Sequence, residues 1–171
     1  MPVLIVVGPV EGDGHHRQGH PERPSRIGAA MGGVDDLHLG DDLLVLPARP
    51  ADTTQLVRVH SRDYLEELER FCATGGGPLD ADTYATPESW DAARLSAGAG
   101  LVAVEALAER DSGVAFVVGR PPGHHALADR SMGFCLLNNV AVAAAALVAA
   151  GERVLIVDWD VHHGNGTQAL F

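Results

Sequence analysis

The sequence predicts an α/β protein built on an open parallel sheet that is flanked by helices. Short apolar runs rich in valine, leucine and isoleucine recur along the chain, as expected for strands that are buried on both faces. Residues 113–158 also show the order strand, helix, strand, which is the order of a βαβ unit. Because two parallel strands need a crossover connection of this kind, the sheet is expected to be parallel.

The first half of the chain is expected to contain two strands and the helices that follow them. Gly8 and Pro9 close the first apolar run, Ser61 is a suitable N-cap for a helix, and Gly75 is a suitable stop. A polar loop over 11–25 leads to the first helix. The expected elements are strands over 3–7 and 42–48, helices over 25–37 and 61–74, and a short helix or turn over 52–59.

The second half of the chain continues the α/β pattern. Its expected elements are a loop over 75–87, a long helix over 89–110, strands over 113–119 and 153–158, and a helix over 135–151. The sequence shows neither an internal repeat nor a linker, so residues 1–171 are assigned to one domain. A further helix is expected near Phe171, and an α/β sheet would usually continue from there. The chain is therefore expected to be the N-terminal part of a larger domain.

Composition limits the classes of function. The chain has 171 residues, of which 46% are hydrophobic, and this suits one domain with a packed core. The formal net charge of −11 disfavours nucleic acid and anionic membranes as direct partners. The N-terminus lacks the basic segment of a signal peptide, and no apolar run is long enough to span a bilayer. With only two cysteines, Cys72 and Cys135, the expected localisation is the reducing cytoplasm.

Two of the expected strands end in loops that are crowded with polar side chains. The strand over 113–119 leads into RPPGHHA, and the strand over 153–158 leads into DWDVHHGNG. Ligands of open α/β sheets bind beyond the carboxyl ends of the strands. We therefore expect the two loops to meet at one edge of the sheet. The candidate side chains there are His124, His125, Asp158, Asp160, His162, His163 and Asn165.

The spacing of the acids and histidines after the second of these strands indicates a metal site. Side chains alternate along an extended segment, so Asp158, Asp160 and His162 share one face. A carboxylate and an imidazole two residues apart are suitable ligands for zinc or a similar divalent metal. Asp158 lies one step deeper and is suited to orient a histidine. Trp159 and Val161 point to the opposite face, where they are expected to pack.

The tandem histidines His124 and His125 suggest general acid–base chemistry. Imidazole titrates near neutral pH, and an Asp or Asn behind each ring would give the two rings different roles. A single histidine pair is usually part of a solvated loop, but two pairs after two neighbouring strands favour a functional site. The stretch over 15–24, HHRQGHPERP, is instead interpreted as a solvated loop or a loop that leads into a helix.

A rival motif is GNGTQA over 164–169, which matches the G-x-G-x-x-[GA] pattern of dinucleotide-binding proteins. Six residues, 158–163, separate it from the apolar strand, where the pattern requires almost none. Asp158 and Asp160 would also repel a pyrophosphate. Dinucleotide binding is therefore ranked below metal-dependent catalysis, and retention of a nicotinamide or flavin cofactor would distinguish the two.

Four sequence blocks together resemble one known family. HPERPSRI, RPPGHHA, GFCLLNNVAVAA and VLIVDWDVHHGNGTQ occur in the same order in the zinc-dependent histone deacetylase superfamily. The similarity is greatest to its class II branch and to bacterial relatives that include acetylpolyamine amidohydrolases. The resemblance covers essentially the whole chain, which is similar to the N-terminal half of family domains. It implies a three-layer α/β/α fold, Zn²⁺ as cofactor, and hydrolysis of an N-acetyl amide to acetate and a free amine.

The resemblance also implies metal sites. Asp160 and His162 would be two of the three zinc ligands. The backbone around Asp158, Asp160 and His162, reaching to Phe171, would form potassium sites, so K⁺ is a second expected ion. The third zinc ligand of the family is an aspartate that has no match in this sequence.

The resemblance implies an acid–base role for the histidine pair. His125 would be the general base for the zinc-bound water and then the acid for the leaving amine, with Asn165 supporting it. His124 would be its electrostatic partner, backed by Asp158. Some family members have Asp at the position of Asn165, and Asn gives weaker support to a charged imidazole.

Four further residues are matched to the substrate channel of the family. Gly133 and Phe134 would line a narrow channel for the acyl-lysine stem, where an apolar ring suits a methylene chain. Asp82 would be the acid at the rim that holds the substrate backbone. Arg23 would belong to an internal channel associated with acetate release.

The family's oxyanion-stabilising tyrosine or histidine also has no match. A catalytic zinc normally has three protein ligands, and an oxyanion donor contributes about 10²–10³ in rate. The chain alone is therefore expected to bind zinc weakly and to be inactive or nearly so. The alternative is a truncated, non-catalytic fragment that binds metal or acyl-lysine. The sequence leaves open whether the substrate is acetyl-lysine, an acetylated polyamine or another acetylated amine, and whether the protein is a homo-oligomer.

Overall fold

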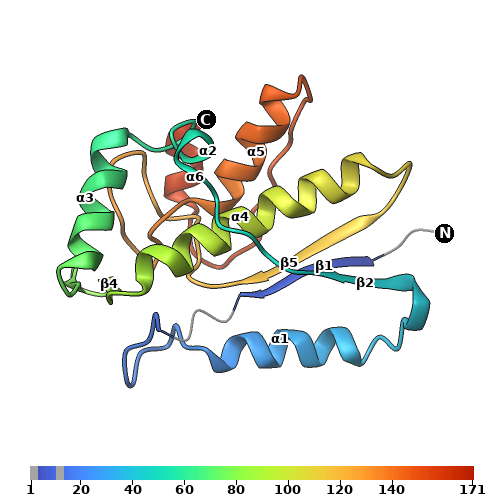
Figure 1. Ribbon diagram of the computed structural model, residues 1–171, viewed down its shortest axis with the longest axis horizontal. Coiled ribbons are helices and arrows are strands. Elements are labelled where there is room, and N and C mark those ends of the chain that lie inside the picture. Colours follow the sequence, from blue (N-terminus) through green and yellow to red (C-terminus); the bar gives the residue numbers. More distant parts are fainter. Residues whose placement is uncertain (1–3, 11–13) are drawn as a thin grey trace.

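The computed structural model describes residues 4–10 and 14–171 and shows helices on both faces of a parallel sheet (Figure 1). The three-stranded sheet has the order β2-β1-β5 and consists of β1 (Leu4–Val10), β2 (Leu43–Leu46) and β5 (Val114–Gly119). Helix α1 (Ser25–Asp35) covers one face, and α4 (Ser89–Ala108) covers the other. The predicted α/β fold with a parallel sheet is confirmed.

The remaining elements surround this centre. They are a 3₁₀ turn η1 (Gly40–Asp42), α2 (Thr53–Leu56), α3 (Arg62–Ala73), a short antiparallel pair β3 (Gly77–Pro78) and β4 (Tyr84–Ala85), α5 (Asn139–Ala149) and α6 (Asn165–Leu170). Helix α5 packs on α4, and α6 in turn contacts α5. The same face of the sheet therefore carries the helices that lead to the C-terminal segment (Figure 1).

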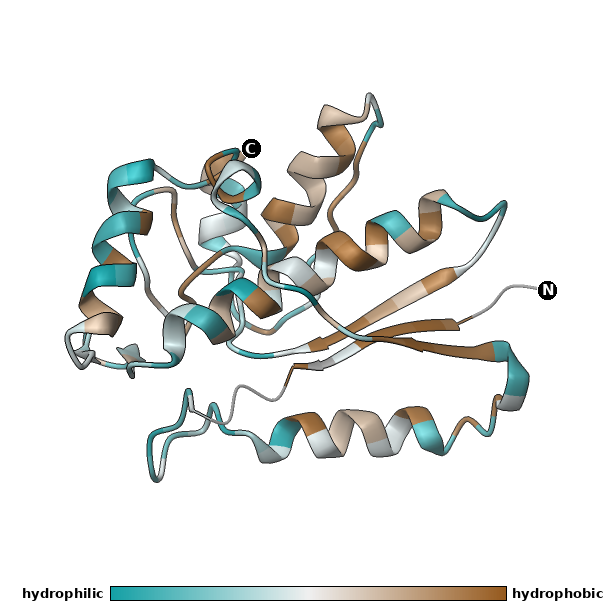
Figure 2. Cartoon of the chain, in the orientation of Figure 1, coloured by the Kyte–Doolittle hydropathy of each residue, from teal (hydrophilic) through white to brown (hydrophobic). Residues whose placement is uncertain are grey.

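Strand β1 lies in the middle of the sheet, and its side chains alternate between the two faces. Ile5 and Val7 share a buried cluster with Ala99 of α4, whereas Val6 shares one with Ile27 of α1. Because both faces are covered, the strand needs apolar residues at every position. This explains the apolar run at the start of the strand, and hydrophobic colour covers most of β1 and β2 (Figure 2).

Strand β1 extends past the Gly8-Pro9 pair that was expected to end it. It pairs with β5 in register up to Val7, and after an irregularity the pairing resumes at Val10. Gly8 has a φ of +130°, and a side chain there would lie 2.4 Å from a backbone oxygen of β5. The glycine thus forms a bulge within the strand instead of a stop. Residue 3 of the expected strand lies outside the described residues.

The strand expected over 153–158 is not a strand in the structure, so the prediction of a complete βαβ unit is wrong. None of the described strands pairs with this segment, and Leu155 is 86% exposed. Trp159 and Val161 do not pack as expected, since they are 90% and 92% exposed. An apolar sequence is not sufficient for a strand, because the backbone N–H and C=O groups also need a neighbouring strand.

Two other boundaries differ from the prediction. The helix expected over 135–151 begins only after Asn138, whose side chain accepts a hydrogen bond from the backbone N–H of Ala141 at 3.1 Å. The residues before this cap, including Leu136, are fully buried in a non-helical segment. The loop expected over 75–87 contains the β3-β4 pair, whose two-residue strands are too short for a periodic signal.

Side-chain caps begin the helices α2 and α3, and the cap of α3 was predicted. Asp52 and Gln55 form a capping box at the start of α2, so the segment expected to be a short helix or a turn contains a short helix. The hydroxyl of Ser61 accepts a hydrogen bond from the backbone N–H of Tyr64 at 3.3 Å, so Ser61 caps α3 as expected. Gly75 follows the end of α3 with a φ of +117°, a conformation that favours glycine.

Both cysteines are free thiols and are buried. Burial raises the pKa of Cys135 to about 12 and raises that of Cys72, so both thiols stay protonated near neutral pH. Among residues 4–10 and 14–171, none of the helices combines the length and the hydrophobicity that a membrane span requires.

His60 fixes the loop after β5 to the start of α5. Its Nδ1 lies 2.9 Å from the carbonyl oxygen of Leu127, and the backbone N–H of Asn138 donates to its Nε2 at 3.0 Å. A carbonyl oxygen can only accept, so Nδ1 carries the proton and Nε2 must stay unprotonated. Burial lowers the pKa of His60, although its backbone hydrogen bonds act in the opposite direction.

We expect the free energy of unfolding to fall as the pH drops below about 6.5, the ordinary pKa of histidine. The pKa of His60 is lower in the folded state, so the unfolded chain takes up the proton first and gains stability relative to the folded chain. Urea unfolding between about pH 7.5 and 5.5 would measure this slope. His60→Phe should flatten it, whereas the exposed control His16→Phe should not. An equal slope in both variants would contradict the assignment.

Candidate functional site

The two polar loops that were expected to meet are in contact. His124 Nδ1 lies 2.9 Å from Asp158 Oδ2, and His125 Nδ1 lies 2.6 Å from Asn165 Oδ1. The backbone N–H of Thr167 also donates to the carbonyl oxygen of His124 at 3.1 Å. These contacts come from the loop after β5, from residue 158 and from α6. The site therefore assembles even though the segment before residue 158 is not a strand.

The partners of the histidine pair determine which ring nitrogen carries the proton. The carboxylate of Asp158 and the amide oxygen of Asn165 can only accept, so both Nδ1 atoms donate. Asn165 is held in this orientation because its Nδ2 donates to the sulfur of Met132 at 3.4 Å. In the neutral rings, each Nε2 then has a free lone pair. The two ring centroids are 4.1 Å apart, so two proton-accepting groups lie next to each other.

The two histidines differ in the charge of their partners. The hydrogen bond with His124 lowers the pKa of Asp158, and the backbone N–H of Asp160 acts in the same direction. Asp158 is therefore anionic at neutral pH, whereas the amide of Asn165 carries no charge. A positive charge on His124 is stabilised by this carboxylate, and His125 has only a neutral dipole behind it.

Asp160 and His162 form a carboxylate–imidazole pair beside the tandem histidines. Asp160 Oδ1 lies 3.0 Å from His162 Nδ1 and accepts from the backbone N–H of His162 at 2.7 Å. These bonds, the backbone one first, lower the pKa of Asp160. The ring centroid of His162 lies 6.1 Å from that of His125.

The chemistry and spacing of this pair fit a divalent metal. Two zinc ligands with metal bonds of about 2.1 Å in a tetrahedral site lie roughly 3.4 Å apart, close to the observed separation of Asp160 Oδ1 and His162 Nδ1. Both side chains are solvent-accessible. Within the part of the chain that the structure describes, no group of three or more His, Cys, Asp or Glu side chains is placed to hold a metal ion. The pair thus has donor atoms and a spacing that fit two ligands of a divalent metal.

Gly133 lies against the ring of His125, and Phe134 follows it in the chain. Both residues have positive φ, +56° and +70°. A Cβ atom on Gly133 would lie 2.4 Å from Cδ2 of His125, so only glycine allows the ring this position. The backbone N–H of Phe134 donates to the hydroxyl of Thr83 at 3.0 Å, and its ring lies edge-on to His20 with the centroids 4.5 Å apart.

The other predicted site residues are distributed around two hollows. Asp82 lines a hollow of about 370 Å³ together with His20 and Phe134. Phe171 is 67% exposed and lines a hollow of about 760 Å³ that also includes Asp160. Arg23 is exposed at the start of α1 and lines neither hollow. The structure therefore brings Asp82 near Phe134, a residue of the predicted channel wall, and leaves Arg23 apart.

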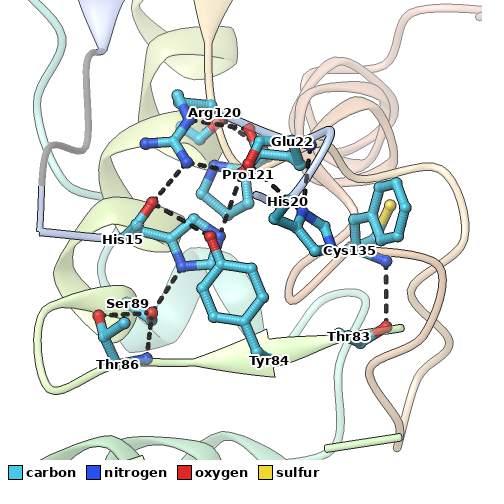
Figure 3. A network of polar contacts seen from close by, with 12 residues as sticks. His15, His20, Glu22, Thr83, Tyr84, Thr86, Ser89, Arg120, Pro121 and Cys135 are labelled. Atoms are coloured by element: carbon cyan, nitrogen blue, oxygen red, sulfur yellow. Dashed lines mark hydrogen bonds and ion pairs between the residues drawn. The ribbon is translucent and has the colours of Figure 1, made fainter. Parts of the chain in front are cut away.

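A buried polar cluster that the sequence did not predict lies next to this wall (Figure 3). The guanidinium of Arg120 donates from Nε to Glu22 Oε1 at 2.8 Å and from Nη2 to Glu22 Oε2 at 2.6 Å. His15 Nε2 lies 3.5 Å from Glu22 Oε2. All three side chains are buried, so the interpretation of residues 15–24 as a solvated loop is wrong for His15 and Glu22.

The electrostatics of Glu22 follow from this cluster. Burial acts to raise the pKa of Glu22, but the hydrogen bonds and charges of His15 and Arg120 outweigh it and lower the pKa to about 2. The sequence contains both members of the pair, Glu22 in HPERP and Arg120 in RPPGHHA, each beside residues assigned to the site. No periodicity shows that two charged residues so far apart in sequence share one buried site, which is why the pair was missed.

The fold and the site together define a class of protein. The class is that of α/β proteins with a polar site beyond the carboxyl end of a parallel strand, and the site here holds a supported histidine pair and a carboxylate–imidazole pair. More particularly, the chain belongs to the histone deacetylase family, because the family model described as "Histone deacetylase domain" matches residues 20–171.

Individual relatives agree with this assignment. The chain is 44% identical to a probable deacetylase of Methanothermobacter thermautotrophicus over 98% of this chain and 50% of that protein. It is 43% identical to a histone deacetylase-like amidohydrolase of Pseudomonas aeruginosa over 90% of this chain and 41% of that protein. The crystal structure of the HDA15 HD domain superposes with a TM-score of 0.91 at 36% identity, covering 100% of this chain and 51% of that one. The chain thus spans about half the length of these relatives.

Proposed function

We propose that the full-length protein that carries this chain is a zinc-dependent deacetylase, which hydrolyses an N-acetyl amide and releases acetate and a free amine. The observation that carries the proposal is the pair of adjacent imidazoles with different partners, Asp158 behind His124 and Asn165 behind His125. Membership of the histone deacetylase family supports the reaction class. The names of the relatives from Methanothermobacter and Pseudomonas are consistent with it.

Asp160 and His162 would hold the zinc ion through Oδ1 and Nδ1, the two atoms that already lie 3.0 Å apart. When bound, zinc polarises a carbonyl group and lowers the pKa of a water molecule. Their solvent exposure leaves both side chains free to exchange the mutual hydrogen bond for a metal bond. The 6.1 Å between the ring centroids of His162 and His125 supports a metal bound next to the proposed acid–base residue.

His125 is the proton carrier in this proposal. Its Nδ1 proton stays on the amide oxygen of Asn165, so the Nε2 lone pair takes a proton from the attacking water. The water oxygen bonds to the amide carbon, the carbon–nitrogen bond then breaks, and Nε2 returns the proton to the leaving amine. His124, hydrogen-bonded to the anionic Asp158, lies beside this transfer with its ring centroid 4.1 Å from that of His125.

The substrate is proposed to be an acetylated lysine or an acetylated polyamine. Both carry an acetyl group on a flexible methylene chain, which suits the aromatic ring of Phe134, the residue after the glycine that lies against His125. Asp82, which lines the same hollow as Phe134, supplies negative charge or an acceptor at the rim. The net charge of −11 favours cationic substrates of either kind.

A second candidate is a non-catalytic fragment that binds metal or an acyl chain. The absence of a group of three metal-ligating side chains in the described ranges favours it for this chain in isolation. A metal with two protein ligands is held more weakly than one with the three that catalytic zinc sites normally have.

Zinc analysis and deacetylation of a fluorogenic acetyl-lysine peptide by the same samples would test the proposal. We expect the full-length protein to contain about one zinc per chain and to lose both zinc and turnover in Asp160→Ala. The exposed loop control Asp111→Ala should keep both. Residues 1–171 alone should bind zinc weakly and show little or no turnover. Full turnover by zinc-free full-length protein would refute the proposed function.

A further inference from the structure

The buried pair of Glu22 and Arg120 joins two functional loops. Arg120 opens the loop that carries His124 and His125, and Glu22 lies near the end of the loop over 14–24. Both charged groups are buried, and the two parallel hydrogen bonds between them fix their relative orientation. Arg120 also donates to the carbonyl oxygen of His15. The guanidinium of Arg120 therefore holds the loop over 14–24 at two points, Glu22 and His15 (Figure 3).

The ring of His15 secures the start of the same loop. It stacks on Tyr84 with a centroid distance of 4.8 Å and an angle of 6° between the planes. Its Nδ1 lies 2.6 Å from the hydroxyl of Ser89, and its Nε2 faces Glu22. Together with the Arg120 bonds, these contacts leave the backbone around Glu22 little freedom to move.

The backbone of Glu22 in turn orients the ring of His20. The carbonyl oxygen of Asp82 lies 3.1 Å from His20 Nε2 and can only accept, so Nε2 carries the proton. In the neutral ring with the proton on Nε2, Nδ1 accepts from the backbone N–H of Glu22 at 3.1 Å, which is shorter than its 3.3 Å separation from the carbonyl oxygen of Glu22. The edge of this ring meets Phe134 at 4.5 Å and Tyr84 at 5.0 Å between centroids. His20 thus connects the loop over 14–24 to Phe134 and to Asp82.

We propose that Glu22, clamped by Arg120, is a positioning residue that holds His20 in one ring orientation and thereby fixes the wall formed by His20, Phe134 and Asp82. This inference rests on the proposed function in one respect, namely that the substrate chain passes along this wall. Glu22 itself is buried and does not reach the reacting atoms. It acts on substrate binding through His20, while the proton transfer at His125 depends on Asn165.

Steady-state kinetics of the full-length protein would test this role. In Glu22→Asp the charge is kept, but the shorter side chain cannot reach Arg120 in the same geometry. In His20→Phe the ring contacts are kept and both hydrogen bonds are lost, while the buried pair stays intact. For an acetyl-lysine peptide we expect KM to rise about tenfold in each variant, with kcat changed by less than about threefold. The exposed control His16→Phe should change neither constant.

The double variant distinguishes positioning through His20 from an independent effect. If Glu22 acts through His20, the rise in KM for Glu22→Asp/His20→Phe should be no larger than the greater of the two single effects. A rise equal to the product of the single effects would overturn the proposal. So would an unchanged KM in a folded His20→Phe variant.

A measurement that does not depend on turnover separates this inference from the proposed function. The ¹⁵N shifts of the His20 ring should show the single Nε2–H tautomer in the unaltered protein and a mixture of tautomers in Glu22→Asp. A single tautomer retained in Glu22→Asp would overturn the positioning role. A mixture in that variant, combined with no turnover in the unaltered protein, would support the positioning role and overturn the proposed function.

Discussion

His125→Ala in the full-length protein is expected to lower kcat/KM for an acetyl-lysine peptide by about 10²–10⁴, the usual contribution of a positioned general acid–base group. The reason is the geometry of its ring. Nδ1 is occupied by Asn165 at 2.6 Å, so Nε2 is the nitrogen available to take and return a proton. Alanine removes that nitrogen and leaves the pair of Asp160 and His162 in place. Most of the loss should therefore appear in kcat.

Two comparisons make this prediction specific. His16→Ala removes an exposed histidine of the tandem pair 15–16, which lies outside the site, and should leave kcat/KM within about twofold, as for other surface substitutions. His125→Ala should also retain the zinc content of the unaltered protein, because the proposed ligands are Asp160 and His162. A loss of less than about tenfold in kcat would contradict the role of His125 as the proton carrier.

Local sequence rules predicted most of the first half of the fold. The cap at Ser61 and the capping box at Asp52 depend on residues within three positions, so they can be identified from the sequence itself. The alternation along β1 depends on a period of two and was equally predictable. The bulge at Gly8 was missed because a glycine followed by proline is compatible with a stop and with a bulge, and only the pairing with β5 distinguishes them.

The segment over 153–158 shows where local rules end. Its apolar residues have the composition of a buried strand, but the side chain of Leu155 is largely exposed and none of the described strands pairs with the segment. Strand formation depends on a partner that may be distant in sequence, and periodicity carries no information about that partner. The order of the loops after the two apolar runs predicted that these side chains would meet, and the resemblance to the histone deacetylase family supplied the particular pairs, His124 with Asp158 and His125 with Asn165.

The buried pair of Glu22 and Arg120 gives the largest expected effect on stability. Arg120→Met would leave the carboxylate of Glu22 buried without its main partner, and removal of one member of such a pair typically costs about 3–5 kcal/mol in the free energy of unfolding. Urea unfolding near neutral pH would measure the loss. Arg49→Met, at the exposed pair of Arg49 and Glu105, is the matched control and should cost about 1 kcal/mol or less.

The pH dependence of the free energy of unfolding shows whether the ionised form of Glu22 stabilises the folded protein. The pKa of Glu22 is lowered to about 2 in the folded protein, so the folded state holds this proton more weakly than the unfolded chain. The stabilisation is therefore present above the ordinary pKa of glutamate, near 4.3, and is lost as the pH falls from there towards 2. Glu22→Gln/Arg120→Met should remove this part of the acid dependence and recover part of the stability lost in Arg120→Met, because no uncompensated charge remains buried. A double variant as unstable as Arg120→Met, with the acid dependence of the unaltered protein, would show that the pair does not control stability.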